Sequence, residues 1–147
     1  MSLKEWLIKK LSGDDSAKLI LSAEEEELSG LNLQEVLGAH MAWKEKLNST
    51  LDGTSTERYE ISSVSQDNLC VLGKWLYGPG KKYYSKLPEY DALKKVHREF
   101  HLCAADVLRE HGKGNIKTAT QILNGKFRDA SNLIQLDLVG LFSSAKG

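Results

Sequence analysis

The chain is poor in cysteine, balanced in charge and free of long apolar runs, and each absence excludes a class of protein. Only two cysteines occur among its 147 residues, which argues against a disulfide framework and excludes a zinc site made of cysteine alone. The 20 basic residues equal the 20 acidic ones and form no long basic stripe, so we expect no nucleic-acid binding. No stretch approaches the length of a membrane span and no secretory segment begins the chain. We therefore expect no membrane insertion and a cytoplasmic location.

The composition that remains is that of one globular domain with a sizeable core. Hydrophobic residues make up 41% of the chain and charged residues 27%. Apolar residues recur at helical spacing over residues 32–53, 68–80, 88–111 and 116–142, and the connectors are short. This pattern predicts an all-α fold, an antiparallel four-helix bundle with an additional short helix and an N-terminal extension.

The boundaries of these helices follow from capping residues. Asn32 is a good N-cap with Glu35 three residues later, and Gly53 ends the first helix. Pro88 lies near the first turn of the third helix, and Gly73 suggests close approach of another backbone. Residues 54–66 are expected to form a loop, and Gly78-Pro79-Gly80 to end the short helix.

The domain is expected to span residues 32–147, because residues 1–31 differ from the rest of the chain. Residues 2–11 could form a short amphipathic helix, whose apolar side is made by Leu3, Trp6, Leu7 and Leu11. Ser29-Gly30 is expected to belong to a solvated linker or a helix end. No chemistry is apparent in this extension.

Three of the four histidines, His40, His97 and His101, fall on inward helix faces, and Cys70 falls on or near one. His97 and His101 are four residues apart, so their Cβ atoms lie about 5–6 Å apart on one helical face. Zinc takes nitrogen at about 2.0–2.1 Å and thiolate sulfur at about 2.3 Å, usually as a tetrahedron. These four residues would supply three nitrogens and one sulfur from three helices.

The same residues have a plainer interpretation. A single histidine on an apolar helix face is usually a core residue bonded to a carbonyl or carboxylate group. Three together with a cysteine favour a metal, because three buried imidazoles without partners would be costly. Cys103 is interpreted as a small core residue, and His111 as a residue at a helix C-terminus that interacts with the helix dipole.

Two classes of metalloenzyme fit poorly, so no enzymatic activity is expected. In "HREFH" the acidic residue is Glu99, two positions after the first histidine and rotated about 200° away from it. It is therefore not the general base of a His-Glu-x-x-His hydrolase. A di-iron bundle needs Glu-x-x-His pairs. The residues three positions before His97, His101 and His40 are Lys94, Arg98 and Leu37.

Three stretches resemble one known family. "GAHMAWKEKL", "NLCVLGKWLYGPG" and "LPEYDALKKVHREFHLCAADVL" are similar, in this order, to the signature blocks of the chemoreceptor zinc-binding domain, CZB. The family's ligands fall on His40, Cys70, His97 and His101. "QILNGKFRDASNLIQLDLVGLF" resembles its closing helix, so the likeness extends over residues 32–142.

The resemblance implies a zinc-bound helical domain of a bacterial cytosol that takes part in chemotaxis or other signal transduction. Such domains are frequently homodimers and are commonly attached to a chemoreceptor signalling region or a diguanylate cyclase. Neither module is present in this chain, so we expect a stand-alone member with a signalling protein of that type as partner. The family senses zinc or oxidants such as hypochlorous acid, with the cysteine ligand, here Cys70, as the redox-reactive atom.

Coordination chemistry supports this function. Four protein ligands fill a tetrahedral zinc shell and leave no position for an activated water. Bound to Zn²⁺, Cys70 would be a thiolate, the form that oxidants attack, and its oxidation would weaken one ligand. The alternative is a purely structural zinc in a protein-interaction scaffold, without any redox response.

Overall fold

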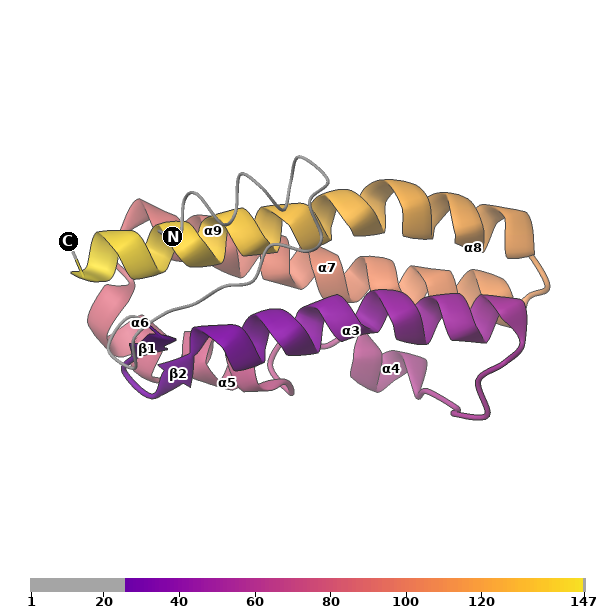
Figure 1. Cartoon of the computed structure of the whole chain (residues 1–147), viewed down its shortest axis with the longest axis horizontal. Coiled ribbons are helices and arrows are strands. Elements are labelled where there is room, and N and C mark those ends of the chain that lie inside the picture. The colour runs from indigo at the N-terminus through magenta and orange to yellow at the C-terminus, as the bar shows by residue number, and fades with distance from the viewer. Residues whose placement is uncertain (1–25, 147) are drawn as a thin grey trace.

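The computed structural model describes residues 26–146, which are helical apart from one small hairpin (Figure 1). The all-α prediction is confirmed. The elements, in chain order, are β1 (Glu27–Leu28), β2 (Leu31–Asn32), α3 (Leu33–Asp52), α4 (Ile61–Val64), α5 (Val71–Tyr77), α6 (Pro79–Tyr84), α7 (Pro88–Gly112), α8 (Ile116–Ile122), the π-helical turn η1 (Leu123–Phe127) and α9 (Arg128–Lys146). The amphipathic helix expected around Leu3 and Trp6 lies outside the described residues.

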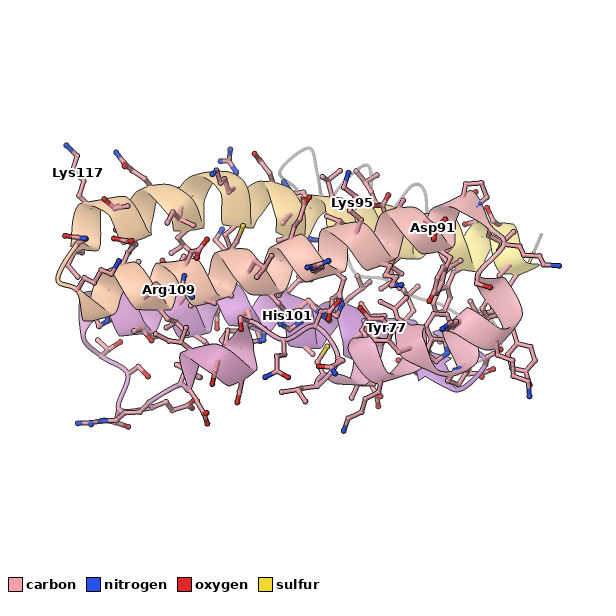
Figure 2. All side chains as sticks on the ribbon, turned by 180° about the vertical axis from the view of Figure 1, so that it is seen from behind. Tyr77, Asp91, Lys95, His101, Arg109 and Lys117 are labelled. Atoms are coloured by element: carbon pink, nitrogen blue, oxygen red, sulfur yellow. The ribbon has the colours of Figure 1, made fainter. Side chains whose placement is uncertain are left out.

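Three long helical segments lie side by side: α3, α7 and the continuous run α8–η1–α9 (Figure 1). The first two begin at the same end of the molecule, and α9 runs in the opposite direction. The short helices α4, α5 and α6 follow α3 in the chain and return it to the end of the molecule at which α7 begins. Seen from behind, α7 lies in front with Asp91, Lys95 and Arg109 along its length (Figure 2). No helix among the described residues is long and apolar enough to cross a bilayer.

The predicted helix boundaries of α3 and α7 are confirmed. The Asn32 side chain accepts a hydrogen bond from the amide N–H of Glu35, and Gly53 follows α3 in a left-handed conformation with φ of 80°. Pro88 occupies the first turn of α7, where its missing N–H costs nothing. Both helices bury one face, and Leu33, Leu47, Leu93 and Phe100 are completely buried.

The chain before α3 differs from the prediction. Ser29 and Gly30, expected in a linker or helix end, form the two-residue turn of the β1–β2 hairpin, and both have positive φ. The indole N–H of Trp75 donates to the Ser29 carbonyl at 3.0 Å. Leu28 and Leu31 are buried in the core. The hairpin is therefore packed on the body of the protein, although the domain boundary at residue 31 stays a prediction.

The segment between α3 and α7 is more broken than predicted. Part of the expected loop is the single-turn helix α4, which buries Val64. The expected end of the short helix is confirmed, since α5 ends at Tyr77 with Gly78 as its C-cap. Pro79 also begins α6, which was not predicted, because proline is tolerated at a first helical position.

The last helix is also not a single α-helix over residues 116–142. It contains the wider turn η1, and α9 continues to Lys146. Ala119, Leu123 and Phe127 are buried at steps of four residues. Leu123 and Phe127 are the first and last residues of η1, so the buried face continues through the wider turn.

Candidate metal centre

Helix α7 brings His97 and His101 together. Both lie on its buried face, with 0% and 5% of their surface exposed. Their ring centroids are 4.6 Å apart, and their Nε2 atoms approach to 3.0 Å. This pairing follows directly from the four-residue spacing, because such residues are neighbours on a helix.

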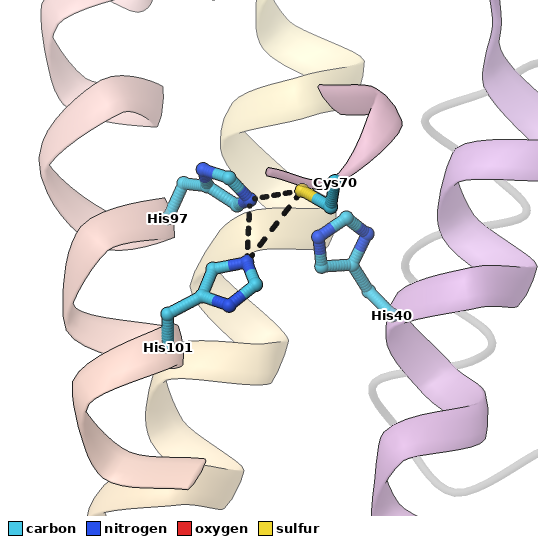
Figure 3. Close-up of side chains that lie close together, drawn as sticks. All are labelled: His40, Cys70, His97 and His101. Atoms are coloured by element: carbon cyan, nitrogen blue, oxygen red, sulfur yellow. Dashed lines mark hydrogen bonds between the residues drawn. The ribbon is translucent and has the colours of Figure 1, made fainter. Parts of the chain in front are cut away.

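Cys70 reaches the same point from the turn before α5. It is the N-cap residue of that helix, and its Sγ lies 3.3 Å from His97 Nε2 and 3.6 Å from His101 Nε2 (Figure 3). The amide N–H of Gly73 donates to the sulfur at 3.4 Å. Gly73 also allows the turn to close, since a Cβ there would lie 1.8 Å from the carbonyl oxygen of Asp67. The predicted close approach of a second backbone is confirmed.

His40 completes the group from α3. It is buried, and its ring centroid lies 5.2 Å from that of His97 and 6.1 Å from that of His101. Its Nδ1 is bonded to the carbonyl oxygen of Val36 at 2.8 Å, which leaves Nε2 as the nitrogen available to a metal. Figure 3 shows the ring directed from α3 toward Cys70 and the two histidines of α7.

The distances suit a tetrahedral zinc ion. One ligand atom from each of His40, Cys70, His97 and His101 lies within 4.8 Å of all the others. Zinc–nitrogen and zinc–sulfur bonds of ordinary length give edges of about 3.4 Å between nitrogens and about 3.6 Å between nitrogen and sulfur. The edges of 3.0, 3.3 and 3.6 Å among the α7 histidines and Cys70 are close to these values. The four side chains are thus arranged to coordinate a metal ion.

Hydrogen bonds outside the group fix which imidazole nitrogen faces inward. The Nδ1 atoms of His40 and His101 are bonded to the carbonyl oxygens of Val36 and Val64, at 2.8 and 3.0 Å. A carbonyl accepts only, so these nitrogens carry the protons and the Nε2 lone pairs point to the centre. A neutral histidine in this tautomer is the form that binds metal.

Burial also keeps the imidazoles neutral. It lowers the pKa of His97 to about 2, with further contributions from His101 and His40, and it lowers the pKa of His40 to about 4. The pKa of His101 is lowered for the same reason. Burial raises the pKa of the Cys70 thiol, and the N–H of Gly73 works in the opposite direction. A cation in the centre would therefore be needed to hold the sulfur as a thiolate at neutral pH.

The remaining candidate residues lie outside this group. His111 is near the end of α7 and does not belong to the metal-ligand cluster of the described residues. Glu99 and Cys103 line a surface groove of about 370 Å³ between α7 and α9, on the outer side of α7. Cys103 is half-buried, and its pKa is raised by burial. The two cysteines therefore belong to different environments.

Comparison with known families identifies the segment that carries the centre. Residues 40–108 match the chemoreceptor zinc-binding domain, CZB. The match begins at His40 and includes Cys70, His97 and His101, so the resemblance seen in the sequence is confirmed over this range. No curated protein and no solved structure matches the chain significantly.

The CZB match gives zinc as the cofactor, and the donor set of this chain fits it. Three neutral imidazoles and one sulfur are borderline-soft ligands that zinc prefers. The structure brings together all four side chains predicted from the sequence, but the carbonyl oxygens of Val36 and Val64 that orient two of them were not predicted. Backbone acceptors leave no trace in residue identity, and no signal in the sequence indicates them.

Proposed function

We propose that this chain is a cytoplasmic zinc-binding sensory domain in which His40, Cys70, His97 and His101 are the four ligands of one Zn²⁺. The CZB match and the convergence of four donor atoms within 4.8 Å support this assignment. Bound zinc supplies the positive charge that holds Cys70 as a thiolate. With four protein ligands the shell is closed, so we propose regulation rather than catalysis.

The exposure of Cys70 relative to the other ligands is the observation that carries the sensory role. The three histidines are at most 6% exposed, whereas Cys70 is only half-buried. Its sequence neighbours Leu69 and Val71 are 48% and 68% exposed. Cys70 is therefore the most exposed of the four residues, and we propose that a small oxidant reaches its sulfur from solvent while the helices cover the imidazoles.

The proposed reaction is the oxidation of Cys70 by hypochlorous acid. The thiolate sulfur gives up two electrons and becomes the sulfenic acid S–OH, and the chlorine of HOCl leaves as chloride. A sulfenic acid is a poorer metal ligand than a thiolate. Loss of this bond leaves three imidazoles, which weakens zinc binding and releases the turn before α5.

The arrangement of the helices supports a further part of the proposal, an antiparallel four-helix bundle. In it, α4, α5 and α6 together take the place of one long helix between α3 and α7 (Figure 1). The broken helix would then supply Cys70, and the continuous helices α3 and α7 would supply the three histidines. We also propose that the protein is a homodimer and that its output passes to a signalling protein of the chemoreceptor or diguanylate cyclase type. The family match is the support for both.

Metal analysis during an oxidant titration tests the function. The purified protein should contain one zinc per chain and release it as about one equivalent of hypochlorous acid is added. The Cys103→Ser variant should behave like the wild type, because Cys103 lies in the groove outside the centre. Zinc that stays bound at unchanged affinity after Cys70 is oxidised would contradict oxidant sensing.

A purely structural zinc is the second candidate, and the burial of three ligands favours it. A shell held by His40, His97 and His101 at 6% exposure or less should exchange its metal slowly. This candidate predicts one zinc per chain and no change in zinc content over the same titration. The two functions are therefore separated by one experiment.

A further inference from the structure

His97 differs from the other two histidines of the centre in its outer nitrogen. The Nδ1 atoms of His40 and His101 are bonded to backbone carbonyls, but the buried Nδ1 of His97 has no hydrogen-bond partner among residues 26–146. If Nε2 binds a metal, the neutral imidazole must carry its proton on Nδ1. This N–H then lies in the core, where an acceptor is needed.

A second unpaired polar atom lies on the helix that packs against α7. Gln135 of α9 is 6% exposed, and its Oε1 is buried without a partner in the described part of the chain. Its Nε2 makes one long bond of 3.4 Å to the carbonyl oxygen of Ser131. Apart from the three histidines and the aromatic residues Trp75 and Tyr90, whose polar groups are hydrogen-bonded, Gln135 is the only polar side chain that is buried among the described residues.

Contacts between α7 and α9 place Gln135 level with His97. At one end, Glu89 of α7 accepts a hydrogen bond from Ser144 and lies beside Gly140. His97 follows Glu89 by eight residues. Because the two helices run in opposite directions, an equal step back along α9 from residues 140–144 leads to residues 132–136 (Figure 1).

The other end of this helix pair gives the same register. Residues 99–106 of α7 share a groove with residues 126–133 of η1 and α9, so the level of each α7 residue is fixed from both sides. Gln135 lies on the buried face of α9, between Ile134 and Leu138. Figure 3 shows α9 passing behind the four ligands.

From these two unpaired atoms at one level, we infer that Gln135 is a positioning residue of the metal centre: its Oε1 accepts a hydrogen bond from Nδ1–H of His97 when zinc is bound at Nε2. The inference rests on the proposed function, since it requires His97 to be a ligand. The long bond to Ser131 leaves the amide free to reorient. Such outer partners fix the ring and raise the basicity of the ligating nitrogen.

Zinc affinity of Gln135 variants tests the inference, measured by competition with a chelator of known affinity at pH 7. Gln135→Met keeps the length of the side chain and removes the acceptor, so its zinc dissociation constant should rise about 10–100-fold. Gln135→Glu keeps an acceptor and should stay within about threefold of the wild type. Gln121→Met, an exposed glutamine of α8, is the matched control and should bind like the wild type.

The stability of the zinc-free protein separates positioning from packing. Gln135→Met removes a buried amide whose oxygen is unpaired and whose nitrogen makes only one long bond, so the urea midpoint of the zinc-free variant should be equal to or above that of the wild type. Weaker zinc binding without lower zinc-free stability supports the inference. Unchanged zinc affinity, or a parallel loss of affinity and zinc-free stability, would overturn it. If the wild type itself binds no zinc, the proposed function fails instead.

A measurement on the wild type needs no substitution. In the zinc-bound protein, nitrogen-15 NMR of the histidine rings should show a slowly exchanging proton on Nδ1 of His97, because a hydrogen-bonded N–H in the core is shielded from solvent. Its chemical shift should move in Gln135→Glu and stay in place in the Gln121→Met control. A shift that is identical in all three proteins would contradict the bond.

Discussion

Helix α7 and the segment that carries Cys70 hold the same centre in different ways. His97 and His101 lie on a 25-residue helix whose buried face runs from Tyr90 to Leu108. Cys70 lies in a turn before a seven-residue helix, beside the exposed Leu69 and Val71. Packing of a long helix fixes the two histidines whether or not a metal is present. The position of Cys70 depends on a few local contacts and on the bond to the metal.

Removal of zinc should make this contrast most visible. At free zinc about 1,000-fold above the dissociation constant, chelation should lower the free energy of unfolding by about 4 kcal/mol. Hydrogen exchange should then accelerate most over residues 61–77 and least around His97, because the core of α7 stays packed. Equal acceleration in both regions would show that the metal holds the whole bundle and that the contrast is wrong.

Substitution of the two cysteines should give the next largest difference. Cys70→Ser removes the only sulfur of the proposed zinc shell, so its zinc affinity should fall more than about 100-fold, beyond the range seen for outer partners. Cys103→Ser should bind like the wild type, because that side chain lines the groove between α7 and α9. Chelator competition on both variants measures this. Equal affinities in the two would exclude Cys70 as a ligand.

Two glycines test how tightly the Cys70 turn is built. In Gly73→Ala the new Cβ would meet the Asp67 carbonyl oxygen at 1.8 Å, so the backbone must move, which should cost about 1–3 kcal/mol and weaken zinc binding. Gly38→Ala in α3 meets nothing within 4 Å and should stabilise the protein by about 0.5–1 kcal/mol. Urea unfolding and zinc titration of both variants check the pair. A Gly73→Ala variant with normal affinity would show that the turn tolerates displacement.

The smallest effect is expected at the start of α3. Asn32→Ala removes the side chain that caps the helix through the amide N–H of Glu35, at a cost of about 1 kcal/mol. His40 lies two turns further along and is held by packing, so zinc affinity should change by less than about twofold. A large loss of affinity from this substitution would mean that the long helices do not fix their ligands independently.

Much of the centre was predictable because its ligands follow simple rules. Helical spacing brings His97 and His101 together, and the apolar neighbours of His40 place it on an inward face. The broken segment was less predictable. Pro79 is compatible with both the end of one helix and the start of another, and the turn at Ser29 depends on a distant bond from Trp75. The π-turn at Leu123–Phe127 lies inside a run with continuous helical spacing, so the spacing of apolar residues does not show it.

X-ray absorption at the zinc edge tests the central claim most directly. In the wild type it should find one zinc with three nitrogen neighbours at about 2.0–2.1 Å and one sulfur at about 2.3 Å. The sulfur should vanish in Cys70→Ser and persist in Cys103→Ser. A wild-type shell without sulfur, or one whose sulfur survives the loss of Cys70, would contradict the four-ligand centre.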